Sequence, residues 1–237
     1  MGRRATAVLV TGLLVLTGAL VGLPTLMWWQ SRAAADGPSS MVRQGDGYGS
    51  APSFVLTDQN GRRVSSAQLD GKVQVVSFLF PYCTSYCPEI ARQMTVLQAA
   101  LAGTPLAHRV EIVAFNVDPA GAGPGRMRQF WSEFGGDPSS PDVEFLTGTP
   151  AQIRHVVTDG YHVSYEKVSQ ASETAGGDQP EVRSTVAEQA HVDYDIVHND
   201  FLDIVGPHGR VRQILDHPTQ LSDGALLAAV KEAATAS

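Results

Sequence analysis

Two stretches of the chain are almost entirely apolar and rich in β-branched and aromatic residues. They span residues 73–80 and 110–117. Uninterrupted apolar runs of this length are typical of strands that are covered on both faces of a sheet. Between them, apolar residues recur with the period of a helix and stop before Gly103: Ile90, Met94, Leu97 and Leu101. The pattern therefore predicts a strand, a helix and a second strand.

The rest of the chain continues this alternation of helices and strands. A turn-forming quartet at 58–61 predicts a hairpin of residues 54–57 and 62–65 ahead of the first buried strand. After the second strand we expect, in order, a helix, a strand, a helix capped by Thr149, a strand, two paired strands and a final helix: 126–134, 143–146, 150–157, 161–168, 196–205, 210–215 and 222–234. This order predicts an α/β fold with a mixed central sheet flanked by helices.

The N-terminal segment has the composition of a membrane span. Residues 5–29 carry no charge, follow Arg3 and Arg4, and end in two tryptophans. The run is long enough to cross a hydrocarbon core of about 30 Å, and tryptophan suits the membrane interface. We therefore expect an anchor within residues 1–32, a single-pass transmembrane helix in the cell membrane with the remaining chain on the extracytoplasmic side. A cleaved signal peptide, with the alanines at 33–35 as the cleavage site, is the alternative.

Composition also suggests how the remaining chain is organised. Residues 33–53 are rich in Gly, Ser, Pro and Ala, which predicts a flexible linker. Residues 54–237 are then expected to form the folded domain. Within it, residues 169–189 are polar, acidic and without periodicity, which predicts a mobile insertion.

Length and charge narrow the classes of function. A chain of 237 residues with 43% hydrophobic and 17% charged residues can form one globular domain with appendages. Its formal net charge is -7, and no cluster of Lys and Arg is present. Binding to nucleic acid needs such a cluster to contact phosphates. Nucleic acid is therefore excluded as a partner.

Candidate chemistry lies where the first buried strand gives way to a helix. Cys83 and Cys87, the only cysteines of the chain, occupy this junction, and Pro88 and Glu89 are residues that suit the first turn of a helix. The helix is thus expected to begin at Cys87. The N-terminus of a helix favours a thiolate over a thiol. The two cysteines are therefore expected to form a redox pair or a soft-metal site. A structural disulfide is the alternative.

Four short segments carry a closer resemblance. Residues 78–89 have the form Phe-x-Phe-x-x-Cys-x-x-x-Cys-Pro, and three further segments agree in order: Asn-Val-Asp-Pro at 116–119, Leu-Thr-Gly-Thr at 146–149, and Asp-Ile-Val-His at 195–198 with Gly-Pro at 206–207. Together they resemble the Sco/SenC family of copper-binding assembly factors for cytochrome c oxidase. The resemblance extends from about Phe54 to the C-terminus.

The resemblance implies a thioredoxin-like fold and a specific metal site. In this family two cysteines and a distant histidine bind copper, which corresponds to Cys83, Cys87 and His198 here. It also implies a membrane-tethered copper metallochaperone, with possible thiol-disulfide reductase activity, that serves a subunit of cytochrome c oxidase. Two thiolates and one imidazole are a soft, low-coordinate set that suits Cu(I), and one more donor would accommodate Cu(II). A disulfide between the cysteines would exclude copper, so a thiol-disulfide partner is also expected.

Three positions depart from the family pattern. Thr84 and Ser85 stand between the cysteines in place of Pro-Asp, Val197 replaces an acidic residue, and residues 120–123 read Ala-Gly-Ala-Gly in place of acidic and threonine residues. Fewer carboxylates are therefore expected around the copper site than in the family. The client, the protein that receives the copper, could be another exported copper enzyme. Asp118 is a candidate to support the site, although an aspartate before a proline also suits a turn.

Other assignments remain open at this stage. A thiol-disulfide oxidoreductase or a peroxidase without copper could also use the cysteines, and a peroxidase would draw on Arg92 as the nearest arginine. A tethered interaction domain with an inert disulfide is the third class. His198 is expected to begin an apolar strand, whereas six other histidines are expected at the surface: His108, His155, His162, His191, His208 and His217.

Overall fold

The computed structural model describes residues 42–44, 48–169, 192–216 and 218–235. The predicted anchor lies outside these residues, and so does all of the predicted insertion except Ser169. Among the described residues, no helix is both long enough and apolar enough to cross a membrane.

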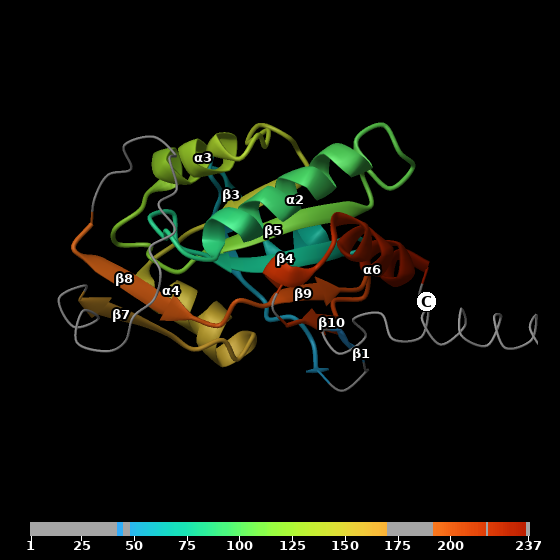
Figure 1. Cartoon of the computed structure of the whole chain (residues 1–237). Helices are drawn as coiled ribbons and strands as arrows, with labels where there is room; N and C mark the ends of the chain where they lie inside the picture. Colours follow the sequence, from blue (N-terminus) through green and yellow to red (C-terminus); the bar gives the residue numbers. More distant parts are fainter. Residues whose placement is uncertain (1–41, 45–47, 170–191, 217, 236–237) are drawn as a thin grey trace, which may run out of the picture. The chain divides into compact units, whose positions relative to one another are not determined.

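A mixed sheet forms the centre of the described domain (Figure 1). Within the described residues it has six strands in the order β1-β10-β9-β4-β5-β6. The neighbours β4, β5 and β6 run parallel, whereas β9, β10 and β1 are added antiparallel. The strands are β1 Val42–Gln44, β4 Val73–Leu79, β5 Val110–Asn116, β6 Val143–Leu146, β9 Leu202–Val205 and β10 Val211–Leu215. The predicted α/β fold with a mixed sheet is confirmed.

Helices cover the sheet, which explains why β4 and β5 are buried along their whole length. In Figure 1, α2 and α6 lie next to each other in front of the sheet, and α6 packs on β4 and β9. The α-helices are α2 Cys87–Leu101, α3 Pro124–Glu133, α4 Pro150–Arg154 and α6 Asp223–Thr235. The other helical segments are the 3-10 helices η3 Ser66–Leu69 and η5 Pro218–Gln220 and the π-helix η4 His155–Gly160. The predicted start of α2 at Cys87 is confirmed.

The predicted N-terminal hairpin is also confirmed, and it covers the open edge of β6. Its strands are β2 Val55–Thr57 and β3 Arg63–Ser65. Thr57 exchanges two backbone hydrogen bonds of 2.8 Å with Thr147. The side-chain amide of Gln59 continues this pairing, because its Nε2 donates to the carbonyl of Val143 and its Oε1 accepts from the backbone of Phe145. An exposed strand edge invites pairing with other chains, and the hairpin removes that edge.

One predicted strand is in fact two. The run predicted as 196–205 divides into β8 Tyr194–His198 and β9 Leu202–Val205. Strand β9 lies in the central sheet, whereas β8, among the strands that the structure describes, pairs only with β7, Tyr165–Ser169, in a separate two-stranded ribbon. Residues 199–201 join them outside any strand. Local sequence patterns report apolar character and not the sheet to which a strand belongs, so the change of sheet was missed.

Two boundaries differ from the sequence prediction by four residues or more. Strand β7 begins at Tyr165 and not at 161, because α4 continues into η4 and His162 then adopts a positive φ of 59°. The described domain also begins before the predicted residue 54. Strand β1, which falls within the stretch predicted as a linker, pairs with β10, and Ser50 forms a β-bridge with Arg210.

Candidate metal centre

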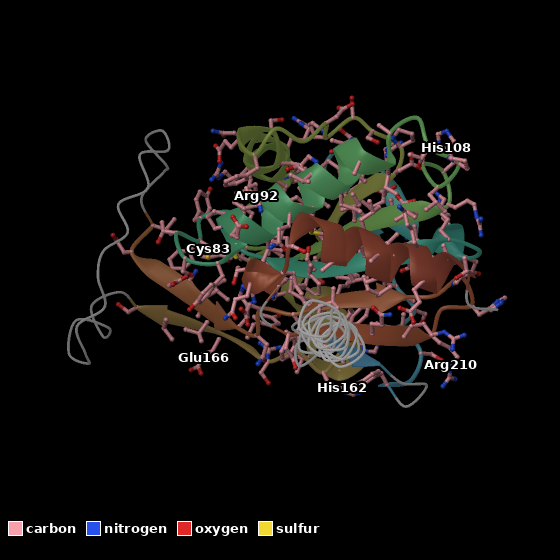
Figure 2. The ribbon with its side chains drawn as sticks, turned by 45° about the vertical axis from the view of Figure 1, so that its right-hand side comes forward. Cys83, Arg92, His108, His162, Glu166 and Arg210 are labelled. Atoms are coloured by element: carbon pink, nitrogen blue, oxygen red, sulfur yellow. The ribbon has the colours of Figure 1, made fainter. Side chains whose placement is uncertain are left out.

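The loop of residues 80–86, between β4 and α2, carries the first cysteine (Figure 2). The backbone N–H of Cys83 donates to the carbonyl of Phe80 at 2.9 Å, which forms a tight turn. Arg126 of α3 fixes the same loop, because its guanidinium donates to the carbonyl of Pro81 and lies 5.1 Å from the ring centre of Tyr82. Both contacts hold the cysteine loop against the body of the domain.

The two cysteines are free thiols at the N-terminus of α2. Cys87 is fully buried and Cys83 is 4% exposed. A hydrogen bond with the Cys87 thiol lowers the pKa of Cys83 to about 6, with a further contribution from Ser85, although burial opposes the shift. The Ser85 hydroxyl lies 3.3 Å from the Cys83 sulfur. The Cys83 hydrogen bond and burial raise the pKa of Cys87 well above its ordinary value. Cys83 is therefore the thiolate of the pair near neutral pH.

His198, on strand β8 of the two-stranded ribbon, approaches the two cysteines. Its Nε2 lies 3.6 Å from the sulfur of Cys87, and its Nδ1 lies 2.9 Å from the carbonyl oxygen of Asn199. A carbonyl oxygen only accepts, so Nδ1 carries the hydrogen and Nε2 presents its lone pair to the cysteine. This is the tautomer that a histidine needs to bind a metal through Nε2. The residue ends β8, and the prediction that it begins an apolar strand is wrong.

Sequence reasoning missed Tyr194, which connects β8 to the rest of the site. Its hydroxyl donates to Oδ2 of Asp118 at 2.6 Å, and its ring stacks on Phe80 at a centroid distance of 5.7 Å. Asp118 also forms the turn that the sequence suggested, because its backbone carbonyl accepts from Gly121 and Ala122. Asp118 thus forms the expected turn and also binds a tyrosine of β8, whereas its role in supporting a metal site stays a prediction. Its position after a buried strand was the available signal, but its tyrosine partner was not visible in the sequence.

The other candidates are four exposed histidines, two histidines outside the described residues, and Arg92 of α2. His108 pairs with Asp142 and His155 with Asp159, and both imidazoles are more than two-thirds exposed. His162 and His208 are also exposed, whereas His191 and His217 lie outside the described residues. Arg92, the candidate for a peroxide pocket, forms an ion pair with Glu89 on the surface of α2, with a shortest distance of 2.8 Å.

The donor set fits a soft metal, although its atoms are not yet arranged around a metal. The Cys87 thiol lowers the pKa of Cys83, and the Cys87 sulfur lies 3.6 Å from Nε2 of His198. Among the described residues, no group of three His, Cys, Asp or Glu side chains already surrounds a common point. Two sulfurs and an imidazole nitrogen are nevertheless the donors that Cu(I) prefers. Small side-chain movements would have to bring the three donors onto a shared ion.

Comparison with known proteins decides the family. The sequence model described as SCO1/SenC matches residues 43–235. The chain belongs to this family. The SCO1 protein homolog of Bacillus subtilis is 28% identical over 160 residues, covering 67% of this chain and 69% of that protein. The SCO2-like protein of Rickettsia felis is 30% identical over 118 residues, covering 49% of this chain and 53% of the relative.

Solved structures of the family share the fold. ScoI of Bradyrhizobium japonicum with copper bound superposes with a TM-score of 0.59 at 24% identity, covering 77% of this chain and 98% of that one. BsSco, a member of the Sco family of cytochrome c oxidase assembly proteins described with a disulfide switch, superposes with a TM-score of 0.59 at 22% identity. The match covers 82% of this chain and 99% of BsSco. The predicted thioredoxin-like Sco fold is confirmed. The expectation of copper is confirmed for relatives, since ScoI of Arabidopsis thaliana was also solved with copper bound.

Proposed function

We propose that this chain is a membrane-tethered copper metallochaperone. Copper is its cargo, held by Cys83, Cys87 and His198, and is passed to the copper centre of a cytochrome c oxidase subunit or of another exported copper enzyme. The domain would lie on the extracytoplasmic side of the cell membrane. The membership in the SCO1/SenC family and the copper-bound relatives support this proposal.

The single observation that carries the proposal is the approach of His198 to Cys87. The Nε2 atom lies 3.6 Å from the sulfur of Cys87, and the Cys87 thiol in turn lowers the pKa of Cys83. A soft ion entering this space would replace one thiol proton and gain two thiolates and one neutral imidazole. Before a metal binds, the chain already holds the histidine in the Nδ1–H tautomer, buries both cysteines and provides one of them as a thiolate.

A second function is supported by the low pKa of Cys83. A thiolate near neutral pH beside a second thiol is also the arrangement of a thiol-disulfide oxidoreductase. Reduction of a partner disulfide would begin with attack by the Cys83 thiolate, which breaks the partner's S–S bond and forms a mixed disulfide. The Cys87 thiolate, after losing its proton, would then release the partner's thiol and close the Cys83–Cys87 bond. In this role His198 would not bind a metal.

Genetic complementation distinguishes the two functions. Cells that lack the chain should lose copper from cytochrome c oxidase or from another exported copper enzyme, and the wild-type chain should restore it. His198→Ala should fail to restore the copper content even though both cysteines remain. Full restoration by His198→Ala would favour the thiol-disulfide oxidoreductase and would contradict the copper proposal.

A further inference from the structure

The ribbon of β7 and β8 has one face turned toward the metal centre. Side chains alternate along a strand, so Tyr194, Ile196 and His198 share one face of β8. In the ribbon register, Lys167 is opposite Ile196 and Tyr165 is opposite His198. Tyr194 on this face contacts Phe80 and Asp118, and His198 contacts Cys87.

Hydrogen bonds of the central sheet do not hold this ribbon in place. Among the described strands, β7 and β8 pair only with each other. An isolated two-stranded ribbon is only marginally stable, and its placement depends on side-chain contacts. The distance between His198 and Cys87 therefore depends on the side chains that attach β8 to the domain, together with residues 199–201, which join β8 to β9.

Tyr194 attaches β8 to the domain through its ring and its hydroxyl, beside the buried Ile196. Its ring lies between Phe80, whose backbone carbonyl holds Cys83, and Lys167, whose Nζ lies 3.3 Å from the ring centre. Its hydroxyl donates to Oδ2 of Asp118, a residue that is 4% exposed. The side chain thus links the cysteine loop and the β5–α3 loop to the strand that carries the histidine.

The β5–α3 loop is built to admit this bond. The backbone N–H of Gly121 donates to Oδ1 of Asp118 at 3.2 Å, while the backbone of Asp118 is held by the side chain of Asn116. A Cβ at position 121 would lie 2.0 Å from Oδ2 of Asp118 and 2.2 Å from the hydroxyl of Tyr194. Only glycine leaves room for the bond between the phenol and the carboxylate.

We infer that Tyr194 is a positioning residue of the metal centre, and that its bond to Asp118 sets His198 opposite Cys87. The inference rests on the proposed function, because it assigns Tyr194 a role in the copper affinity contributed by the histidine. Removing the hydroxyl would leave a buried carboxylate oxygen without its donor, so β8 would shift to let water reach Asp118.

The test compares Tyr194→Phe with Tyr48→Phe in the full chain. Tyr48 lies beside the β-bridge between Ser50 and Arg210, away from the ribbon, and no hydrogen bond found among the described residues uses its hydroxyl. Competition with a Cu(I) chelator should show affinity lowered roughly tenfold by Tyr194→Phe, as for other groups that orient a ligand, and unchanged by Tyr48→Phe. Adding His198→Ala to Tyr194→Phe should have little further effect, because the histidine is already displaced.

A second readout needs no metal. Nuclear Overhauser contacts between the His198 ring and the Cys87 side chain in the reduced metal-free chain should be present in the wild type, where Nε2 lies 3.6 Å from the sulfur, and weakened in Tyr194→Phe. Gly121→Ala, which leaves the tyrosine intact, should weaken them in the same way. Unchanged contacts in both variants would overturn the inference. If the wild-type chain fails to bind Cu(I), the proposed function fails, but the NMR comparison still decides the role of Tyr194.

Discussion

The Nε2 atom of His198 lies 3.6 Å from the sulfur of Cys87, although 111 positions separate the two residues in sequence. The contact joins two parts of the fold that share no sheet, since Cys87 begins α2, which follows β4 of the central sheet, and His198 ends β8 of the separate ribbon. It turns a cysteine pair that could serve redox chemistry alone into a set of three soft donors.

Oxidation of the cysteines should prevent copper uptake. Both thiols are free and belong to the N-terminus of α2 and the loop before it, so we expect that a disulfide can form, and a sulfur in that bond no longer supplies a thiolate ligand. Copper uptake by the oxidised chain should be at background and should return after treatment with a phosphine reductant that is then removed. Chain mass after alkylation counts the free thiols in each sample. Equal uptake with the disulfide intact would mean that copper binds elsewhere.

Alkylation of the reduced, metal-free chain should favour Cys83. Its pKa of about 6 makes it largely thiolate at pH 7, whereas the Cys87 pKa is raised. The alkylation rate should therefore rise through a midpoint near pH 6, with the label found on Cys83 by mass spectrometry. Cys87→Ala removes the main hydrogen-bond partner, so the midpoint should move upward. A midpoint that Cys87→Ala leaves unchanged would show that the contact does not set the Cys83 pKa.

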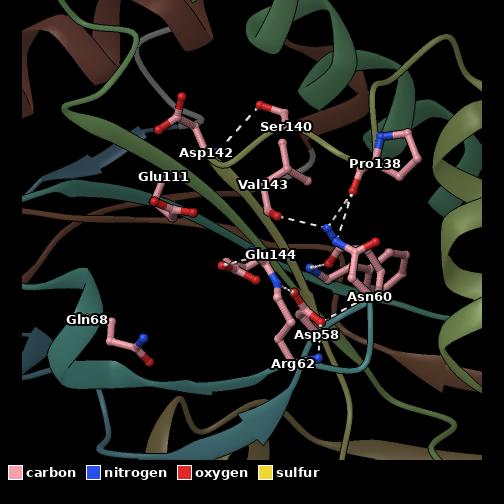
Figure 3. Close-up of polar contacts among 12 residues, drawn as sticks. Asp58, Asn60, Arg62, Gln68, Glu111, Pro138, Ser140, Asp142, Val143 and Glu144 are labelled. Atoms are coloured by element: carbon pink, nitrogen blue, oxygen red, sulfur yellow. Dashed lines mark hydrogen bonds and ion pairs between the residues drawn. The ribbon is translucent and has the colours of Figure 1, made fainter.

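Stability should fall as the pH rises toward neutrality, because of a buried acidic group far from the cysteines. Figure 3 shows Arg62 near Asp58 and Glu144, with its Nη2 3.8 Å from Glu144. Burial, followed by the charges of Glu111 and Asp58, raises the Glu144 pKa from 4.5 to about 7, against the opposing effect of Arg62 and Lys72.

The sign follows from proton binding. Between pH 4.5 and about 7 the folded state keeps a proton on Glu144 that the unfolded state has lost, so the free energy of unfolding decreases as the pH rises through this range. Burial also raises the pKa of Asp203 to about 7, so this residue lowers the free energy of unfolding over the same pH range. Urea unfolding at pH 5 and pH 7.5 should show the decrease, Glu144→Gln should reduce it, and Glu144→Gln with Asp203→Asn should reduce it further. If the free energy of unfolding decreased equally with pH in all three proteins, the assignment of this decrease to Glu144 and Asp203 would be contradicted.

The N-terminal segment should keep the protein in the membrane. Residues 5–29 are uncharged, and we expect the mature chain to remain in the membrane fraction after washing at alkaline pH. A chain that starts at Met41 is the matched control and should be recovered in the soluble fraction. A mature soluble product that begins near Asp36 would show that the segment is a cleaved signal peptide.

The sequence was most informative where structure is determined locally. Apolar runs predicted β4 and β5, and Pro88 with Glu89 predicted that α2 begins at Cys87. Histidine 198 came from the family resemblance. The break between β8 and β9, the separate ribbon and the bond between Tyr194 and Asp118 were not predicted, because they depend on which distant segments pack together. No local period encodes that choice.

Copper binding by the reduced chain tests the central claim most directly. We expect one Cu(I) per chain for the wild type, loss of binding in Cys83→Ser and in Cys87→Ser, and weaker binding in His198→Ala. His208→Ala changes an exposed histidine and is the control that should bind as the wild type does. The measurement is copper and protein content after gel filtration in the presence of a competing chelator. One copper per chain in the double variant Cys83→Ser with Cys87→Ser would contradict the account.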